Sequence, residues 1–514
     1  MRLIIANRLS GEGSRRRKLD AVERVANTLS ANTDILRDSQ PKAEEKRRVL
    51  VVDADDADVS TLAAELGEDV LIEPELPRYT AEAGYSALDA LVEAQGSDPV
   101  APGLGQALEF TVVGDGKGVV GARVLCVLSP LSGVGAGTRM ESATDKDGKV
   151  GFNFDPVRYW PSLVAIEPSN SFWSALVAPP PLGGEVTLGL LPKSGPDAWW
   201  RQMVNVASHD LSLGAGIRIG VVDTGFGPHP YLKHVKGLGA ITASGDQRTA
   251  KATKDSLGHG THVTGLIGAR PVDGSGDYAG IAPGADLAVI RVFDETGGAH
   301  QGDIAEAIDA MAIDFEADVI NLSLGAAEPS MIERDAVIAA AERGSLCVAS
   351  AGNGRGAPLS FPAGYPETIA VSALGVIGAA PQGTMAAASL PSMASAFAAG
   401  APGVFVANFS NAGGGLTCCA PGVGILSTVP ATSAVPAPYG VKNGTSMAAP
   451  IATAALATVL AADPIYKELE RGAGRTNRAG QVLVAMLRQI GLAQPVGGYG
   501  LATGYAPPPT NSNP

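Results

Sequence analysis

Ile219-Gly220-Val221-Val222-Asp223-Thr224-Gly225 is an apolar run that ends in a carboxylate and a glycine turn. A short apolar run bounded in this way predicts a strand buried on both faces, as in a parallel sheet. Helical patterns alternate with further apolar runs of the same kind, at residues 286–293, 319–323, 346–350 and 368–373. Strands separated by helices predict an α/β fold, a doubly wound, mostly parallel sheet with helices on its faces.

Ligands of such sheets bind beyond the carboxyl ends of the strands, where Asp223, Ser323 and Asn353 are expected. Two more segments carry polar residues in glycine-rich surroundings: Gly258-His259-Gly260-Thr261-His262, and Asn443-Gly444-Thr445-Ser446-Met447 ahead of an apolar helix. Taken singly, each has a structural interpretation. The aspartate would cap a turn, the histidine would be structural, and the serine would be a helix N-cap.

Taken together, three of these residues form a plausible reaction path. A serine hydroxyl becomes a good nucleophile when an imidazole accepts its proton, and a carboxylate orients and stabilises that imidazole. Asp223, His259 and Ser446 supply these groups in the chain order Asp, His, Ser. This is the order of the subtilisins, and it differs from the order in chymotrypsin-like and α/β-hydrolase enzymes.

The chain resembles the subtilisin-like serine peptidases, the subtilase family (peptidase S8), over residues 199–506. Ordered segments beyond the three catalytic candidates carry the resemblance: Asn321-Leu322-Ser323-Leu324-Gly325, Ala351-Gly352-Asn353 and Phe361-Pro362-Ala363-Gly364. The resemblance implies a hydrolase, a serine endopeptidase that cuts peptide bonds through an acyl-enzyme. It also implies that the Asn353 amide and the Ser446 N–H form the oxyanion hole. The alternative for Asn353 is a residue in a left-handed turn.

The same resemblance implies a pocket for the residue before the cut. Its small, apolar walls favour an apolar side chain there, and the substrate backbone would pair with them as an added strand. The residues expected to bind substrate are Ser323, Leu324, Gly325, Ala351, Gly352 and Ser360.

Outside the peptidase region, residues 196–506, the sequence predicts two further domains, a linker and a tail. Residues 1–78 have the β-α-β-β-α-β order of a ferredoxin-like α+β domain, with helices at 19–29 and 59–66, and resemble an inhibitory subtilase propeptide. Residues 79–105 are a linker with one helix, 83–94. Residues 106–195 are an all-β sandwich that resembles transthyretin-like or carboxypeptidase-regulatory-like modules. Residues 507–514 are a disordered tail.

Charge supports an interaction between these parts. Residues 1–50 carry 12 Lys and Arg against 7 Asp and Glu, whereas the whole chain has a net charge of −14. We therefore expect residues 1 to about 80 to dock on the acidic peptidase domain and occlude its cleft, as in a zymogen. The partners expected are protein or peptide substrates and this N-terminal domain. The basic run Arg15-Arg16-Arg17-Lys18 is interpreted as a solvated face and not as a nucleic-acid site.

Composition excludes several other classes. With 45% hydrophobic and 18% charged residues, the chain is too apolar for a disordered protein. Its strongly apolar helix, 448–462, has about 15 residues, short of the roughly 20 that a membrane span needs. No C-x-x-C or H-E-x-x-H motif is present, which argues against zinc and a disulfide scaffold, and the adjacent Cys418 and Cys419 are expected to be buried thiols.

Some expectations are less specific. No cofactor is required, and structural calcium at Asp273 and Asp277 has only two carboxylates to support it. No signal-peptide core follows Met1, which predicts a cytoplasmic or non-classically exported protein. Residues 374–408 are an insert that forms either a flap near the cleft or a surface elaboration. The alternative function is a non-catalytic binding or scaffold protein that retains a peptidase fold.

Overall fold

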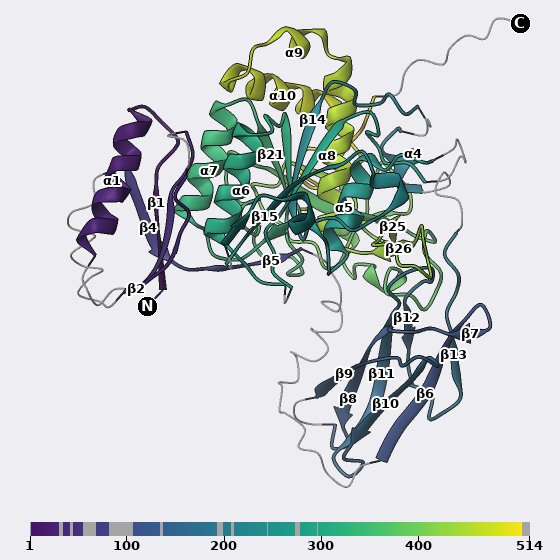
Figure 1. The fold of residues 1–514 in the computed structure, drawn as a ribbon. Coiled ribbons are helices and arrows are strands. Elements are labelled where there is room, and N and C mark those ends of the chain that lie inside the picture. Colours follow the sequence, from purple (N-terminus) through teal and green to yellow (C-terminus); the bar gives the residue numbers. More distant parts are fainter. Residues whose placement is uncertain are drawn as a thin grey trace, which may run out of the picture.

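The computed structural model describes residues 2–29, 34–41, 45–54, 68–81, 106–133, 137–192, 199–206, 210–243, 245–272, 278–295 and 297–505. Figure 1 shows three parts: an N-terminal α+β domain (the N-domain, residues 2–74), an all-β module (the β-module, residues 106–192) and a large α/β domain (the catalytic domain, residues 199–505). The helices expected at 59–66 and 83–94 and the tail at 507–514 lie outside the described residues.

An 11-stranded sheet forms the centre of the catalytic domain. In spatial order its strands are β16 (Gly245–Gln247), β15 (Lys236–Thr242), β17 (Asp286–Arg291), β14 (Arg218–Asp223), β19 (Val319–Leu322), β21 (Leu346–Ser350), β22 (Ile369–Val376), β24 (Cys418–Pro421), β28 (Leu501–Ala502) and β27 (Leu487–Arg488), and β23 (Val404–Val406) pairs with β22. All neighbours from β15 to β28 are parallel. The predicted α/β sheet, mostly parallel, is therefore confirmed.

Helices cover both faces of this sheet. On one face, α6 (Gln301–Ile313) and α7 (Met331–Glu342) pack over β14, β15 and β21. On the other, α5 (His259–Gly268) and α8 (Thr445–Ala462) pack over β14, β21, β22 and β24. The domain also contains the helix α10 (Ala473–Met486) and the short helices α4 (Trp199–Met203), α9 (Pro464–Glu468) and α11 (Gln494–Gly497).

Helix α8 is long and apolar enough to cross a membrane by length and composition, but 83% of its 18-residue window is buried in the protein. It runs through the main core cluster, where Met447, Ile451 and Leu456 are fully buried. We interpret it as the central helix of this fold, which agrees with the sequence prediction.

The N-domain is a four-stranded antiparallel sheet, in the order β2 (Asp34–Asp38), β3 (Val49–Asp53), β1 (Arg2–Asn7), β4 (Val70–Pro74). One face packs on α1 (Arg15–Thr28) through Leu3, Ile5 and Val22. The other face places Ile4 and Val49 against α6, where a Cβ on Gly302 would lie 3.2 Å from Ile4 Cδ1. Lacking a side chain at this point, α6 allows the sheet to approach closely.

Helix α1 begins at Arg15, four residues before its expected start, because the Ser14 hydroxyl caps it by accepting from Arg17 N at 3.5 Å. The basic run is only partly the solvated face that we expected. Lys18 is buried, since its Nζ donates to Ser10 O at 2.8 Å, whereas Arg16 and Arg17 pair with acidic residues at the surface.

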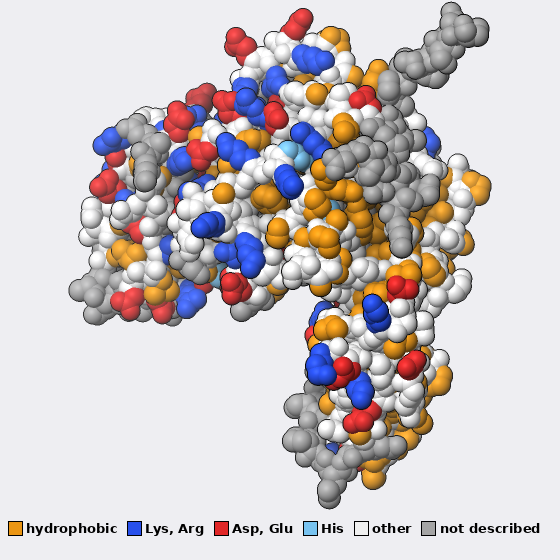
Figure 2. Space-filling model, turned by 45° about the vertical axis from the view of Figure 1, so that its right-hand side comes forward, with side chains coloured by type: hydrophobic (Ala, Val, Ile, Leu, Met, Phe, Trp, Pro, Cys, Tyr) orange, Lys and Arg blue, Asp and Glu red, His pale blue; other side chains and the backbone are white. Residues whose placement is uncertain are grey.

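The β-module has two sheets around one core, which includes Val124, Cys126 and Phe152. One contains β10 (Lys149–Phe154), β6 (Gln106–Gly114), β13 (Glu185–Thr187) and β7 (Lys117–Gly118). The other contains β12 (Ala175–Val177), β11 (Tyr159–Glu167), β8 (Arg123–Pro130) and β9 (Thr138–Ala143). The strand expected at 119–127 starts only at Arg123, because Gly121, with φ of 67°, makes a turn before it. Figure 2 shows the module projecting from the body of the molecule.

The insert 374–408 attaches the β-module to the catalytic domain. Leu176 N of β12 donates to Gly383 O at 2.6 Å, and Met385 N donates to Ser174 Oγ at 3.2 Å. The Met385 side chain is buried against Leu125 and other apolar residues of the module. The insert therefore holds the module in place, a role that neither of our two expectations described.

Candidate active site

A strand from the N-terminal part of the chain lies in the cleft of the catalytic domain. Strand β5 (Pro77–Thr80) pairs antiparallel with β18 (Ala299–His300) on one side and with β20 (Leu324–Gly325) on the other. Figure 1 shows it leaving the N-domain and crossing to the catalytic domain. It spans the domain boundary that we expected at residue 78. An extended chain between two strands is the arrangement in which a peptide is held as an added strand.

Ala81 follows this strand, and its backbone is held at both polar atoms. Its carbonyl oxygen accepts from Ser446 N at 3.1 Å and from Asn353 Nδ2 at 2.6 Å. Its N–H donates to Ser323 O at 3.3 Å. Two donors on one peptide carbonyl, one of them from the start of a helix, are what an oxyanion hole requires.

The orientation of the Asn353 amide is fixed by Thr445. Asn353 Oδ1 accepts from both the N–H and the hydroxyl of Thr445, each at 3.0 Å, so the NH₂ group is the part that faces Ala81. The left-handed turn that we considered is not at Asn353, because the positive φ values nearby belong to Gly352 and Arg355. Asn353 is therefore positioned as a donor and not as a turn residue.

Asp223 and His259 meet where β14 ends and α5 begins. His259 Nδ1 lies 2.7 Å from Asp223 Oδ1, and both side chains are buried. Asp223 Oδ1 also accepts from Thr224 N at 2.7 Å. A carboxylate on Nδ1 favours the tautomer with its proton there, which leaves Nε2 as the basic nitrogen.

Asp255, which was not among the residues expected at the site, organises the start of α5. This buried carboxylate accepts from Thr224 Oγ1 at 3.0 Å, from Gly258 N at 2.8 Å, from Leu257 N at 3.0 Å, and from both the N–H and the hydroxyl of Thr261. These bonds fix the turn that carries His259 and satisfy amides at the helix start. The signal was present in the sequence: an aspartate four residues before the histidine, ahead of a helix.

Ser446 is the second residue of α8 and not its N-cap, which is Gly444. Its hydroxyl donates to Ser323 O at 3.1 Å. Pro450 lies four residues further on and has no N–H for the Ser446 carbonyl, which accepts instead from Ser323 Oγ at 2.9 Å. The proline thus ties the serine to the end of β19.

The expected substrate-binding residues fall in two groups. Leu324 and Gly325 pair with Thr80 and Tyr79 of β5, and Ser323 binds the Ala81 backbone. Behind them, Ser360 N donates to Ala351 O at 2.9 Å, and a Cβ on Gly352 would lie 2.2 Å from Ser360 Oγ. Three of the six residues thus contact the segment that ends at Ala81, and the other three adjoin them through Ser360, which lies next to Gly325.

The described residues do not test the calcium expectation. No group of three or more His, Cys, Asp or Glu side chains that could hold a metal ion occurs among the described residues. Asp273 and Asp277, where calcium was expected, lie outside them. Cys126, Cys347, Cys418 and Cys419 are buried and unpaired as disulfides, and burial raises the pKa of the Cys347 thiol to about 12.

A parallel α/β sheet that presents an aspartate–histidine pair and holds a peptide carbonyl at the N–H of a serine has the features of a serine peptidase. The comparisons agree with this class. The model of the subtilase family (peptidase S8) matches residues 214–487, and the chain therefore belongs to the subtilase family. As members of that family are, it is a serine endopeptidase, a hydrolase.

Three relatives illustrate the similarity. Subtilisin Savinase of Lederbergia lenta is 34% identical over 265 residues, which cover 51% of this chain and 84% of that protein. M-protease of Shouchella clausii (strain KSM-K16) is 33% identical over 288 residues, 54% of this chain and 65% of its own. Subtilisin E of Bacillus subtilis (strain 168) is 33% identical over 258 residues, 49% of this chain and 58% of its own.

Proposed function

We propose that this peptidase cuts its own chain between Ala81 and Glu82 and that the released N-domain is its inhibitor. The observation that carries the proposal is the Ala81 carbonyl, which accepts from Ser446 N and Asn353 Nδ2. A peptide carbonyl held by these two donors, in a strand paired on both sides, has the position of a bond about to be cut.

In this mechanism Asp223, His259 and Ser446 form the catalytic triad. The Ser446 hydroxyl turns away from Ser323 O, passes its proton to His259 Nε2, and attacks the Ala81 carbonyl carbon. The oxyanion that forms receives hydrogen bonds from Ser446 N and Asn353 Nδ2. His259 then gives its proton to the departing nitrogen of Glu82 as the peptide bond breaks, and water hydrolyses the ester on Ser446.

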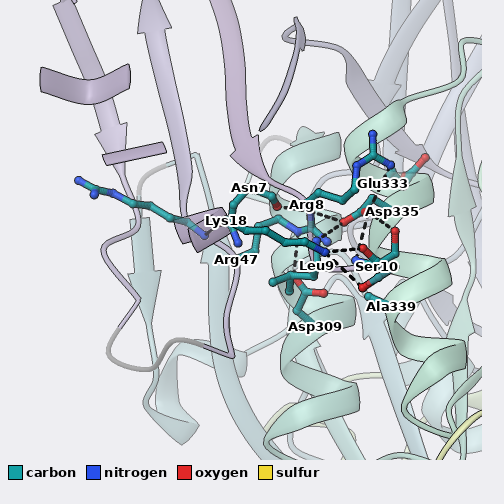
Figure 3. Close-up of polar contacts among 12 residues, drawn as sticks. Asn7, Arg8, Leu9, Ser10, Lys18, Arg47, Asp309, Glu333, Asp335 and Ala339 are labelled. Carbon is teal, nitrogen blue, oxygen red and sulfur yellow. Dashed lines mark hydrogen bonds and ion pairs between the residues drawn. The ribbon is translucent and has the colours of Figure 1, made fainter. Parts of the chain in front are cut away.

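The N-domain is attached to α6 and α7 by ion pairs with little exposure. Arg47 is fully buried and lies 2.8 Å from both Asp309 Oδ2 and Asp335 Oδ2. Figure 3 shows this cluster, in which Leu9 N also donates to Asp335 at 2.7 Å. A second cluster joins Arg37 to Asp303 and Glu306 of α6.

Two contacts continue this interface toward the cleft. The Glu73 carboxylate accepts from Met331 N at 2.7 Å and from the Ser330 hydroxyl, at the positive end of α7. Arg78 of β5 forms two bonds of 3.1 Å with Glu333, and both side chains are fully buried. Because the contacts run from the N-domain to β5 without a break, the domain keeps β5 in the cleft, which is the basis for inhibition.

For specificity, we propose a preference for a small or apolar residue before the cut. Ala81, with 8% exposure, supplies the smallest such side chain. Gly325 and Gly352 leave room around Ser360, since a Cβ on Gly325 would lie 3.1 Å from Ser360 Cβ. No acidic side chain occurs among the six expected pocket residues, so a basic residue has no partner in that set.

Intact-mass spectrometry of the purified chain tests the proposal. The wild type should yield a fragment that begins at Glu82, together with a fragment that ends at Ala81, whereas Ser446→Ala should keep its full length. Ser392→Ala, an exposed serine of the insert, is the matched control and should be cut like the wild type. Equal lengths of wild type and Ser446→Ala would contradict self-cleavage, and a fluorophosphonate probe on Ser446 would then show whether the serine is reactive at all.

A further inference from the structure

A cavity of about 730 Å³ lies between the β-module and the catalytic domain. The β-module contributes Arg123, Arg139 and Glu167 to its lining, together with the loop from Pro168 to Asn170. The catalytic domain contributes residues 256–258 and 440–443, together with Val429, Pro430 and Thr432. Neither domain alone encloses this space.

The cavity adjoins the site of the proposed cut. Gly258 directly precedes His259, and Asn443 lies three residues before Ser446. Thr80, the last residue of β5, lines the cavity, whereas Pro77, Arg78 and Tyr79 do not. Ala81 is not among the lining residues, so the space lies beside the end of the bound strand, next to Gly258 and Asn443.

The wall that the β-module contributes is held firmly in place. Beyond the bonds to Gly383 and Met385 of the insert, Ser171 N donates to Tyr439 O at 2.8 Å, beside the part of β26 (Tyr439–Lys442) that lines the cavity. Trp173 packs against the core of the catalytic domain. A wall fixed by backbone bonds on two sides can select what enters the cavity.

The charged side chains that line the cavity include more cations than acids, although the protein as a whole is acidic. Among the described residues that line the space, Arg123, Arg139 and Lys442 are the cations and Glu167 is the acid, while the whole chain has a net charge of −14. Arg123 also pairs with Glu141 and lies 3.9 Å from Glu167, so the net positive charge is smaller than the number of cations. Such a lining favours a peptide that carries a carboxylate.

The chain's own sequence has that chemistry. Ala81 is followed by Glu82-Ala83-Gly84, so the first residue after the proposed cut is an acid. Consecutive Cα atoms are about 3.8 Å apart, and Thr80 already lines the cavity. A residue two positions further along the chain is therefore within reach of this space.

We propose that this cavity is the binding site for the residues that follow the cut and that it selects an acidic residue directly after the cut. The inference rests on the proposed function and extends it, because it assigns the β-module to the leaving side of the cleft. Arg123 and Arg139 of the module and Lys442 of the catalytic domain would attract the carboxylate, and the resulting preference should weaken with rising salt.

Peptide hydrolysis by the self-cleaved enzyme tests this. Two peptides share an alanine before the cut and differ only in the residue directly after it, which is Glu in one and Gln in the other. For the wild type, kcat/KM should be about two- to fivefold higher for the Glu peptide. The double variant Arg139→Gln/Lys442→Gln should bring this ratio close to one. Arg158→Gln, an exposed arginine of the β-module outside the lining, should leave the ratio unchanged.

The outcomes separate this inference from the proposed function. A wild-type ratio of one, or a ratio that the double variant leaves unchanged, overturns the acidic subsite while the peptidase itself stands. A chain that cuts neither peptide and labels with no fluorophosphonate overturns the proposed function, and the subsite falls with it. A ratio that is high at low salt and falls in both the double variant and high salt supports the assignment.

Discussion

Removing the Arg47 side chain should loosen the N-domain from the catalytic domain. In Arg47→Ala, the buried carboxylates of Asp309 and Asp335 lose the cation that lies 2.8 Å from each. Breaking a buried ion pair from one side costs about 3–5 kcal/mol, because the remaining charge stays out of water. At about 1.4 kcal/mol for each factor of ten, the opening constant of the interface should rise roughly 100- to 4,000-fold.

Hydrogen exchange in a Ser446→Ala background, which we expect to remain uncut, measures this opening. The amides that donate across the interface, Met331 N to Glu73 and Leu76 N to Gln301, should exchange faster in Arg47→Ala by that factor. Arg48→Ala is the matched control, since Arg48 pairs with Asp38 of its own domain. Adding Asp309→Asn to Arg47→Ala should recover part of the protection, because one uncompensated carboxylate is removed. Equal exchange in Arg47→Ala and Arg48→Ala, or no recovery in the double variant, would refute the reasoning.

Three other changes have definite expectations. Asn353→Ala should slow the cut after Ala81 by about 100- to 1,000-fold, the usual cost of an oxyanion donor, for which a subtilisin is the reference case; intact mass against time measures it. Gly352→Ala, whose Cβ would lie 2.2 Å from a side-chain oxygen, should lower Tm by calorimetry at least about 2 °C more than Gly356→Ala, which has φ of 82° but no atom within 4 Å. Burial beneath the N-domain raises the pKa of Glu306 to about 8, whereas an exposed glutamate titrates near 4.3. Docking of the N-domain should therefore weaken as pH rises from about 4.3 to about 8. Glu306→Gln should flatten this pH dependence, measured by hydrogen exchange corrected for intrinsic rates.

The catalytic domain was largely predictable from its sequence because its elements are long and strongly patterned. The strand expected at 346–350 has those bounds in β21, and the helix expected at 331–343 differs from α7 by one residue. The site candidates could be found because their chemistry is local: each lies at a strand end or a helix start among glycines. The contacts that the structure shows, Asp223 with His259 and Ser446 with Ser323, each join a strand end to a helix start, as expected when strand ends share one edge of a parallel sheet.

What the sequence did not predict depends on contacts between distant segments. Strand β5 has no apolar alternation, and its pairing comes from β18 and β20, more than 200 residues further along the chain. The start of α1 was missed because Arg15, Arg16 and Arg17 are exposed and give no apolar period. The docking role of Met385 depends on a partner surface in another domain, which no local pattern can reveal.

The order of the parts along the chain has its own consequence. Since the β-module follows Ala81, a cut there would discard the N-domain yet leave the module joined by the peptide backbone to the enzyme. A removable inhibitor and a permanent part of the enzyme would thus lie on opposite sides of the one bond that is cut. Self-cleavage would therefore open the cleft to peptide substrates. It would leave intact the cavity beside the β-module, which is the proposed site for the residues after the cut.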